Sequence, residues 1–260
     1  MVKLQSIRLE PVLERTLAVG LLLLAWELLP RMGFLDARFL PPFSEVIERL
    51  VKMIVTGRMS VHLLASLQRS LIGFSLAVAL SLPLGVMMGW FKRFERGVDP
   101  LLQMSRNTSV LALYPVFILV FGLGELSKVA IIFWGTLWPI LINTIEGVKG
   151  ADPLLIKSAR SMGSSQLTLL FKVVLPSAMP SILTGFRLSA ARSVLVLVAA
   201  EMLGAQKGLG YLIFQAQLDN ETPEMYAGIV LIALIGVLLN YTLIRFERHA
   251  TRWKEQVEAN

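Results

Sequence analysis

The 260-residue sequence has no cysteine and only two histidines, and charged residues make up just 17% of it. Without cysteine the chain can form no disulfide and offers no thiolate for catalysis or metal binding. The histidines, His62 and His249, are far apart in the sequence, which disfavours a histidine-based metal site. A soluble domain of this length needs more charge to cover its surface. The composition therefore predicts a membrane protein with several spans.

A second absence concerns nucleotides. The sequence contains no G-x-x-x-x-G-K-[ST] motif, the loop whose backbone amides cradle the phosphates of ATP. The nearest glycine groups, in "FGLGE" and "GAQKGLG", lack the Lys-Ser/Thr ending, and we interpret them as turns at the outer ends of spans. No nucleophile–base group and no metal-ligand spacing is present either. We therefore expect no catalytic residue, metal or cofactor in this chain.

Long apolar runs are what the sequence does contain, since 55% of its residues are hydrophobic. A helix needs about 20 apolar residues to cross a bilayer. The runs predict an all-α integral membrane protein with a single transmembrane domain over residues 1–260. The six expected spans are approximately residues 16–30, 62–91, 99–124, 127–148, 177–203 and 225–244. The alternative for the first is a signal peptide, but no small-x-small cleavage site follows it, which favours an uncleaved span.

Lys and Arg residues set the expected orientation of these spans. With the N-terminus inside, the cytoplasmic segments 1–16, 91–97, 148–175 and 245–260 hold 14 Lys and Arg residues, against 7 in the outer segments. Positive residues concentrate on the cytoplasmic side of membrane proteins. We therefore expect a multi-pass protein of the bacterial cytoplasmic (inner) membrane with both termini in the cytoplasm. The basic residues follow the ends of apolar runs, so they indicate contact with membrane lipids and not with nucleic acid.

The segment after the first span has the pattern of an amphipathic helix at approximately residues 43–56. Apolar residues recur there at i, i+3 and i+4 spacing, with Glu and Lys or Arg on the other side. Pro41 and Pro42 break the chain before it, and Ser44 is the expected N-cap. We expect this helix to lie at the outer surface and to pack on the spans.

The segment 149–176, on the cytoplasmic side, is too polar to span the membrane. Asp152 followed by Pro153 predicts the start of a helix, and Gly163 predicts its end. A second short helix, capped by Ser164 or Ser165, is expected to end where Pro176 begins the fifth span. We expect the two helices to meet near Gly163 at roughly a right angle. Small residues at this corner suit docking into a groove of a partner, although a plain connector on the membrane surface explains them equally well.

This corner resembles the cytoplasmic Glu-Ala-Ala loop of permease subunits of binding-protein-dependent ABC importers, whose signature is E-A-A-x3-G-x9-I-x-L-P. Here Lys157-Ser158-Ala159 is followed by three residues, Gly163, nine residues, Val173, one residue and Leu175-Pro176. The spacing from Gly to Leu-Pro matches fully, whereas Lys157, Ser158 and Val173 replace Glu, Ala and Ile. The resemblance assigns ATPase coupling to Lys157, Ser158, Ala159, Arg160, Ser161, Met162, Gly163, Ser164, Ser165, Leu175 and Pro176.

Other segments extend the resemblance over most of the chain. "FLPPFSEVIERL", "PLGVMMGW", "VFGLGELSK", "GFRLSAARS" and "LVAAEMLGAQKGLGYLI" look like the nitrate/sulfonate/taurine branch of these permeases. The resemblance implies the six-helix fold of a type I importer permease that forms the translocation path. It also implies a second identical copy, two ATPase subunits that bind ATP and Mg, and a periplasmic or lipid-anchored substrate-binding protein.

Polar residues within the expected spans are the candidates for the translocation path, since charges at membrane depth are costly and often functional. The candidates are Arg106, Asn107, Asn143, Arg187, Arg192 and Glu201. Arginines that line a passage would lower the barrier for an anion, whereas arginines paired with a glutamate would be structural. The excess of arginine favours a small anionic cargo such as nitrate, a sulfonate or taurine.

Two other functions remain as alternatives. The first is a channel or ion-coupled carrier that works alone. A carrier would normally show paired inverted repeats and a midplane carboxylate or broken helices, and the sequence shows neither. The energy-coupling subunit of a vitamin-type importer also uses cytoplasmic coupling helices, but the Gly to Leu-Pro spacing fits the binding-protein-dependent type better.

Overall fold

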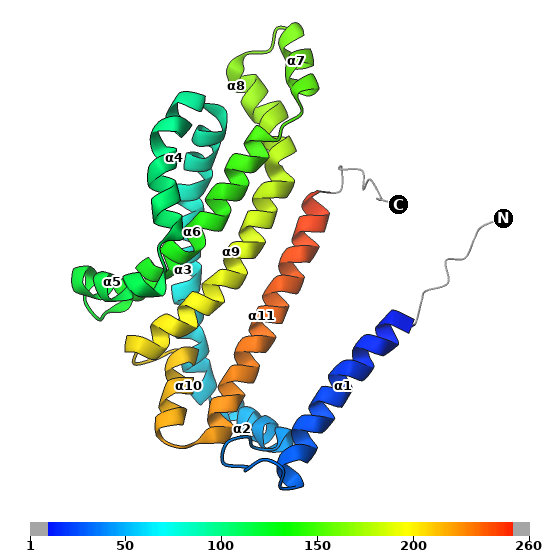
Figure 1. Ribbon diagram of the computed structural model, residues 1–260, viewed down its shortest axis with the longest axis vertical. Coiled ribbons are helices and arrows are strands. Elements are labelled where there is room, and N and C mark those ends of the chain that lie inside the picture. The colour runs from blue at the N-terminus through cyan, green and yellow to red at the C-terminus, as the bar shows by residue number, and fades with distance from the viewer. Residues whose placement is uncertain (1–9, 252–260) are drawn as a thin grey trace, which may run out of the picture. The chain divides into compact units, whose positions relative to one another are not determined.

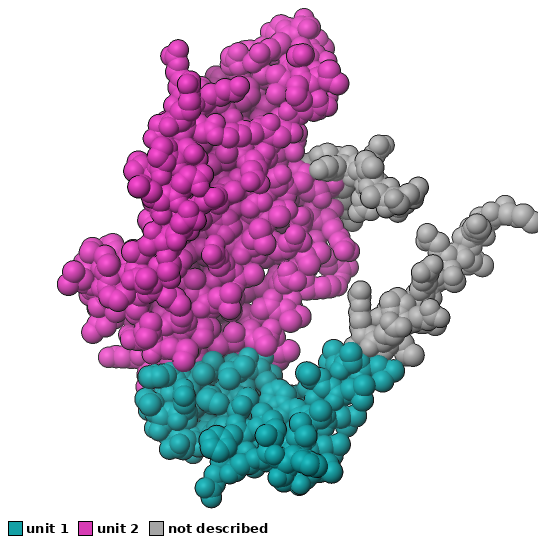
Figure 2. All heavy atoms as spheres, in the orientation of Figure 1, with its two compact units in different colours: residues 1–60, 212–231 teal, residues 61–211, 232–260 magenta. Residues whose placement is uncertain are grey.

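The computed structural model describes residues 10–251, and for residues 10–16 it describes the backbone alone. Every regular element in residues 10–251 is helical, which confirms the all-α class (Figure 1). The ends of the chain, whose cytoplasmic placement was predicted, lie outside the described residues. The helices form two compact units (Figure 2), made of residues 1–60 with 212–231 and of residues 61–211 with 232–260.

Unit 1 contains α1 (Glu10–Arg31), α2 (Phe43–Val55), the end of α10 (Leu209–Leu218) and the start of α11 (Thr222–Ala250). The amphipathic helix was predicted at this place, and Val46, Leu50 and Met53 form its buried face. Arg49 binds Glu224 at 2.8 Å and Glu221 at 3.2 Å, which ties α2 to the start of α11.

Ser44 is not the N-cap of α2, contrary to the sequence-based prediction. The helix begins at Phe43, and Pro42 occupies the cap position without a side-chain hydrogen bond. The Ser44 amide and hydroxyl instead both donate to the Glu27 carboxylate at 2.9 Å. A side chain from α1 therefore accepts the free donor at the start of α2, and a cap from a neighbouring helix cannot be read from local spacing.

Unit 2 is built on close contact between three long helices, α3 (Arg58–Trp90), α6 (Glu125–Lys149) and α9 (Leu175–Gly204). Small residues allow helices to approach closely within a membrane. A Cβ on Gly85 of α3 would lie 2.7 Å from the Thr144 Cβ of α6, and one on Gly185 of α9 would lie 2.9 Å from the Asn143 Cβ. Larger residues at these two glycines would force the helices apart.

Four helical segments are long and apolar enough to cross a membrane: α3, α6, the continuous helix over residues 166–204, and α11. They coincide with four of the six predicted spans. α1, which contains the first predicted span, is not among them because Glu10, Glu14, Arg15, Glu27 and Arg31 interrupt it.

The predicted third span, residues 99–124, is not one continuous helix. It consists of α4 (Lys92–Asn107) and a second helical piece over residues 111–121, which contains η1 (Leu111–Leu113) and α5 (Tyr114–Phe121). The two pieces are bent by 88°, and counting them as one broken span raises the total to five (Figure 1). The change of direction falls at residues 108–110, where Thr108 leaves α4 with an extended backbone. Pro115 lies in the first turn of α5, within the second piece, and does not mark the bend.

Candidate functional site

The corner predicted between the fourth and fifth spans is present at one end of unit 2 (Figure 1). Its first helix is α7 (Pro153–Ser161). The Asp152 side chain accepts a hydrogen bond from the Leu154 amide at 2.8 Å, and Pro153 occupies the first turn. Both features of the predicted helix start are therefore confirmed.

Gly163 ends α7 with a left-handed backbone, at a φ of 78°. Its amide donates to the Arg160 carbonyl at 2.9 Å, and the Ser164 amide donates to the Ala159 carbonyl at 3.2 Å. This pair of bonds is the Schellman arrangement, in which glycine avoids the penalty of a Cβ in the left-handed region. The predicted role of Gly163 at the corner is confirmed in its backbone geometry.

The second helix of the corner begins at α8 (Gln166–Leu169), and Ser165, not Ser164, is its cap. The expected end of this helix before Pro176 is wrong. It continues through a π-helical turn, η2 (Leu170–Val174), into α9, so residues 166–204 form one helix. A proline ring clashes with the carbonyl four residues before it in an α-helix. The wider π turn just before Pro176 relieves this conflict.

Most of the predicted coupling residues are accessible at this corner. Lys157, Ser158, Arg160, Ser161, Met162, Gly163, Ser165 and Pro176 are exposed, and Ser164 and Leu175 are half-buried. Ala159 is 6% exposed and faces inward, so it supports the corner and offers no contact surface.

Sequence reasoning missed the apolar part of the corner surface. Met162 is 78% exposed, and Leu154, Leu155, Leu167 and Phe171 are also exposed on the two helices of the corner. Exposed apolar side chains grouped on one surface mark contact sites for proteins or membranes. The pattern of small residues drew attention to Ser and Gly, whereas large apolar residues are too common in this sequence to stand out.

The candidate residues of the translocation path do not form one cluster. Arg106 and Asn107 are exposed at the end of α4, beside the 88° bend. Arg192 is exposed on α9, while Asn143 donates to the Pro139 carbonyl within α6. Arg187 forms an ion pair with Glu247 at 3.3 Å.

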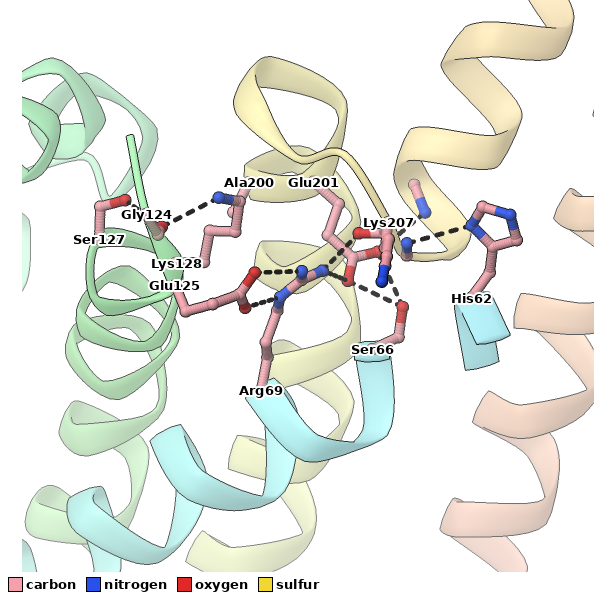
Figure 3. A network of polar contacts seen from close by, with 12 residues as sticks. His62, Ser66, Arg69, Gly124, Glu125, Ser127, Lys128, Ala200, Glu201 and Lys207 are labelled. Carbon is pink, nitrogen blue, oxygen red and sulfur yellow. Dashed lines mark hydrogen bonds and ion pairs between the residues drawn. The ribbon is translucent and has the colours of Figure 1, made fainter. Parts of the chain in front are cut away.

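Glu201 lies in the last turn of α9 and is completely buried in a polar network, shown in Figure 3. Arg69 of α3 donates to its carboxylate at 2.7 Å and is itself buried. The Ser66 hydroxyl, one turn earlier on α3, donates to it at 2.8 Å, and the Gly210 amide donates at 2.9 Å. Glu201 is therefore satisfied within the chain and is closed to a solute in this conformation. The structural alternative considered from the sequence, an arginine paired with a glutamate, therefore describes Arg69 and Glu201.

Arg69 has a second carboxylate partner on its other side, at the start of α6 (Figure 3). Its Nε and Nη2 donate to Glu125 at 2.5 and 2.7 Å, in the two-bond geometry that suits a guanidinium. The Glu125 side chain is 67% exposed, whereas Glu201 is 0% exposed. Arg69 thus joins a buried carboxylate on α9 to an exposed carboxylate on α6.

The same network holds the turn between α9 and α10. Arg69 Nη1 donates to the Lys207 carbonyl at 2.6 Å, and the Leu209 amide donates to the Ser66 hydroxyl at 2.8 Å. The Gly208 amide donates to His62 Nδ1 at 3.2 Å. The two predicted turns are confirmed over residues 122–124 and 205–208, whereas Gly204 is the last residue of α9 and Gly210 lies in the first turn of α10. Within the part of the chain that the structure describes, no group of His, Asp and Glu side chains is arranged to hold a metal ion.

Most of the chain is similar to known proteins. Residues 81–255 match the family described as binding-protein-dependent transport system inner membrane component. The chain is 36% identical over 233 residues to the aliphatic sulfonates transport permease protein SsuC of Bacillus subtilis (strain 168), covering 90% of this chain and 84% of that protein. It is 33% identical over 251 residues to the taurine transport system permease protein TauC of Escherichia coli (strain K12), covering 94% and 91%. Among solved structures, the inward facing MetNI methionine ABC transporter has a similar fold, with a TM-score of 0.65, 20% identity, and coverage of 74% of this chain and 95% of that chain.

Proposed function

The chain belongs to the family of inner membrane components of binding-protein-dependent transport systems, as a permease of an ABC importer, and we propose that its cargo is a small anion. An alkanesulfonate or nitrate is such an anion, and taurine carries the same anionic sulfonate group beside an ammonium. Similar proteins are named for aliphatic sulfonates and for taurine. The exposed guanidinium groups of Arg106 and Arg192 support it further, because a positive side chain lowers the cost of moving an anion through a membrane.

Membership in this family implies partnership with an ATPase and with a substrate-binding protein. We infer a complex of two copies of this chain, two ATPase subunits that bind ATP and Mg, and a periplasmic or lipid-anchored binding protein. In that complex both termini of the chain are cytoplasmic, which agrees with the bias of Lys and Arg. Closure of the ATPase pair on ATP would displace the corner around Gly163 and shift the spans between outward and inward states.

The exposed apolar surface at the corner is the observation that supports coupling to the ATPase. Leu155, Met162 and Leu167 project from a corner whose backbone is fixed by the Asp152 and Ser165 caps and by Gly163. A rigid projection with an apolar tip suits a groove on a partner protein.

Co-purification tests this assignment. The chain is expressed with its ATPase, and the amount of ATPase retained is compared for wild type, Met162→Glu and Lys92→Glu. Met162→Glu buries a charge in the proposed contact and should reduce retention at least tenfold. Lys92 is exposed at the start of α4, outside the corner, so Lys92→Glu serves as the control and should retain the ATPase. Equal retention by both variants would place the ATPase contact elsewhere.

Uptake into vesicles tests the cargo. The assembled complex is reconstituted with its binding protein, and uptake of labelled taurine, an alkanesulfonate, nitrate and a neutral amino acid is compared. The proposal expects ATP-dependent uptake of at least one of the sulfonates or nitrate. Uptake confined to the neutral amino acid would refute an anionic cargo.

A further inference from the structure

A single helix connects the corner to the buried network. Residues 166–204 are continuous over 39 residues, or about 58 Å at the rise of an α-helix. Gln166 begins this helix three residues after Gly163, and Glu201 lies in its last turn. Figure 1 shows α8 next to α7 at one end of the helix and α10 at the other. A rigid displacement of the corner would therefore reach the position of Glu201 along this helix.

Beyond Glu201 the sequence is that of a flexible joint. Gly204, Gly208 and Gly210 fall within seven residues, and glycine has the greatest backbone freedom. A joint of this kind would bend and absorb a displacement of α9 before it reached α10. In the folded chain, however, these residues are tied down by side chains from α3 and α9.

The glycines allow close approach of the Glu201 carboxylate to the backbone. A Cβ on Gly208 would lie 2.3 Å from the Glu201 carboxylate, and one on Gly210 would lie 2.4 Å from the Val198 carbonyl. Because no side chain intervenes, the carboxylate accepts the Gly210 amide directly, and Arg69 reaches the Lys207 carbonyl. The missing side chains of Gly208 and Gly210 thus leave room for the Glu201 carboxylate, which holds the turn.

We propose that Arg69 and Glu201 are positioning residues that make the α9–α10 turn move as one body with the long helix. The buried pair transmits the displacement of the coupling corner to the start of α10, instead of allowing the glycine-rich turn to absorb it. Glu125 is not required for this transmission, because its bonds to Arg69 lead to the exposed start of α6 and not to the turn. This inference rests on the proposed function as an ATP-driven permease.

ATP hydrolysis by the assembled complex in vesicles tests the proposal. It is measured with and without loaded binding protein for wild type, Glu201→Gln, Arg69→Lys and Glu125→Gln. Glu201→Gln keeps the size of the side chain but removes the charge of the buried ion pair, and Arg69→Lys keeps the charge but removes the fork geometry of the guanidinium. We expect both to lower the stimulated component of hydrolysis about tenfold, with unstimulated hydrolysis within threefold of wild type. The control Glu125→Gln should keep stimulation within twofold.

A probe on the turn reports its motion independently of transport. Because the chain has no cysteine, Gln206→Cys introduces a single attachment point for a nitroxide label, and Gln206 is exposed. The electron paramagnetic resonance spectrum should show a more mobile label when Glu201→Gln is added, and an unchanged one when Glu125→Gln is added.

Three outcomes would overturn the inference: stimulation retained by Glu201→Gln, equal loss of stimulated and unstimulated hydrolysis, or a label whose mobility does not change. The first would show that the turn needs no buried pair, and the second that the pair serves folding alone. Failure of the proposed function would look different, since the wild-type complex itself would then show no hydrolysis stimulated by a binding protein.

Discussion

Removing the buried carboxylate should destabilise the chain far more than removing the exposed one. Glu201→Ala leaves Arg69 Nη1, the Ser66 hydroxyl and the Gly210 amide without the acceptor that they share. Removing one partner of a buried ion pair costs about 3–5 kcal/mol. Arg69 keeps Glu125 and the Lys207 carbonyl, so we expect the lower end of that range, about 3 kcal/mol. Glu125→Ala breaks a pair with a largely exposed carboxylate and should cost about 1 kcal/mol or less.

The free energy of unfolding is to be measured by titration of the purified chain in dodecyl maltoside with SDS, followed by tryptophan fluorescence. A double-mutant cycle with Arg69→Ala isolates each pair, and the coupling of Arg69 to Glu201 should exceed its coupling to Glu125. Glu201→Gln keeps an acceptor oxygen and should fall between wild type and Glu201→Ala. Glu201→Ala would refute the reasoning if it lowered the free energy of unfolding by about 1 kcal/mol or less. Equal costs for Glu201→Ala and Glu125→Ala would refute it as well.

Three further predictions follow from particular contacts. Gly163→Ala should destabilise the corner by about 1–2 kcal/mol and speed amide hydrogen exchange in α7. Gly163→Asn should cost less stability, because asparagine tolerates the left-handed backbone. A larger cost for Gly163→Asn than for Gly163→Ala would contradict the Schellman geometry. Asp152→Ala removes the cap of α7 and should cost about 1 kcal/mol, with faster exchange confined to the first turn. Arg187→Ala should lower uptake while the ATPase still co-purifies, and unchanged uptake in vesicles would make Arg187 purely structural.

Local signals predicted the corner well. Asp152, Pro153 and Gly163 act on backbone groups within five residues of themselves, so their roles can be read from spacing alone. The amphipathic helix at Phe43–Val55 was found from its period for the same reason. The prediction for Ser44 failed because its hydrogen-bond partner, Glu27, lies 17 residues earlier on another helix, beyond the reach of a local pattern.

The sequence by itself determined the class of the protein: an apolar, cysteine-free chain without a phosphate-binding loop, with a two-helix corner of recognisable spacing. Only the tertiary structure decided the rest. It bent the predicted third span by 88°, continued the corner helix through Pro176, and brought Arg69 and Glu201, 132 residues apart, to 2.7 Å. The physical reason is that caps and helical periods act over one or two turns. A buried ion pair forms between residues that only the packing of α3 against α9 makes neighbours.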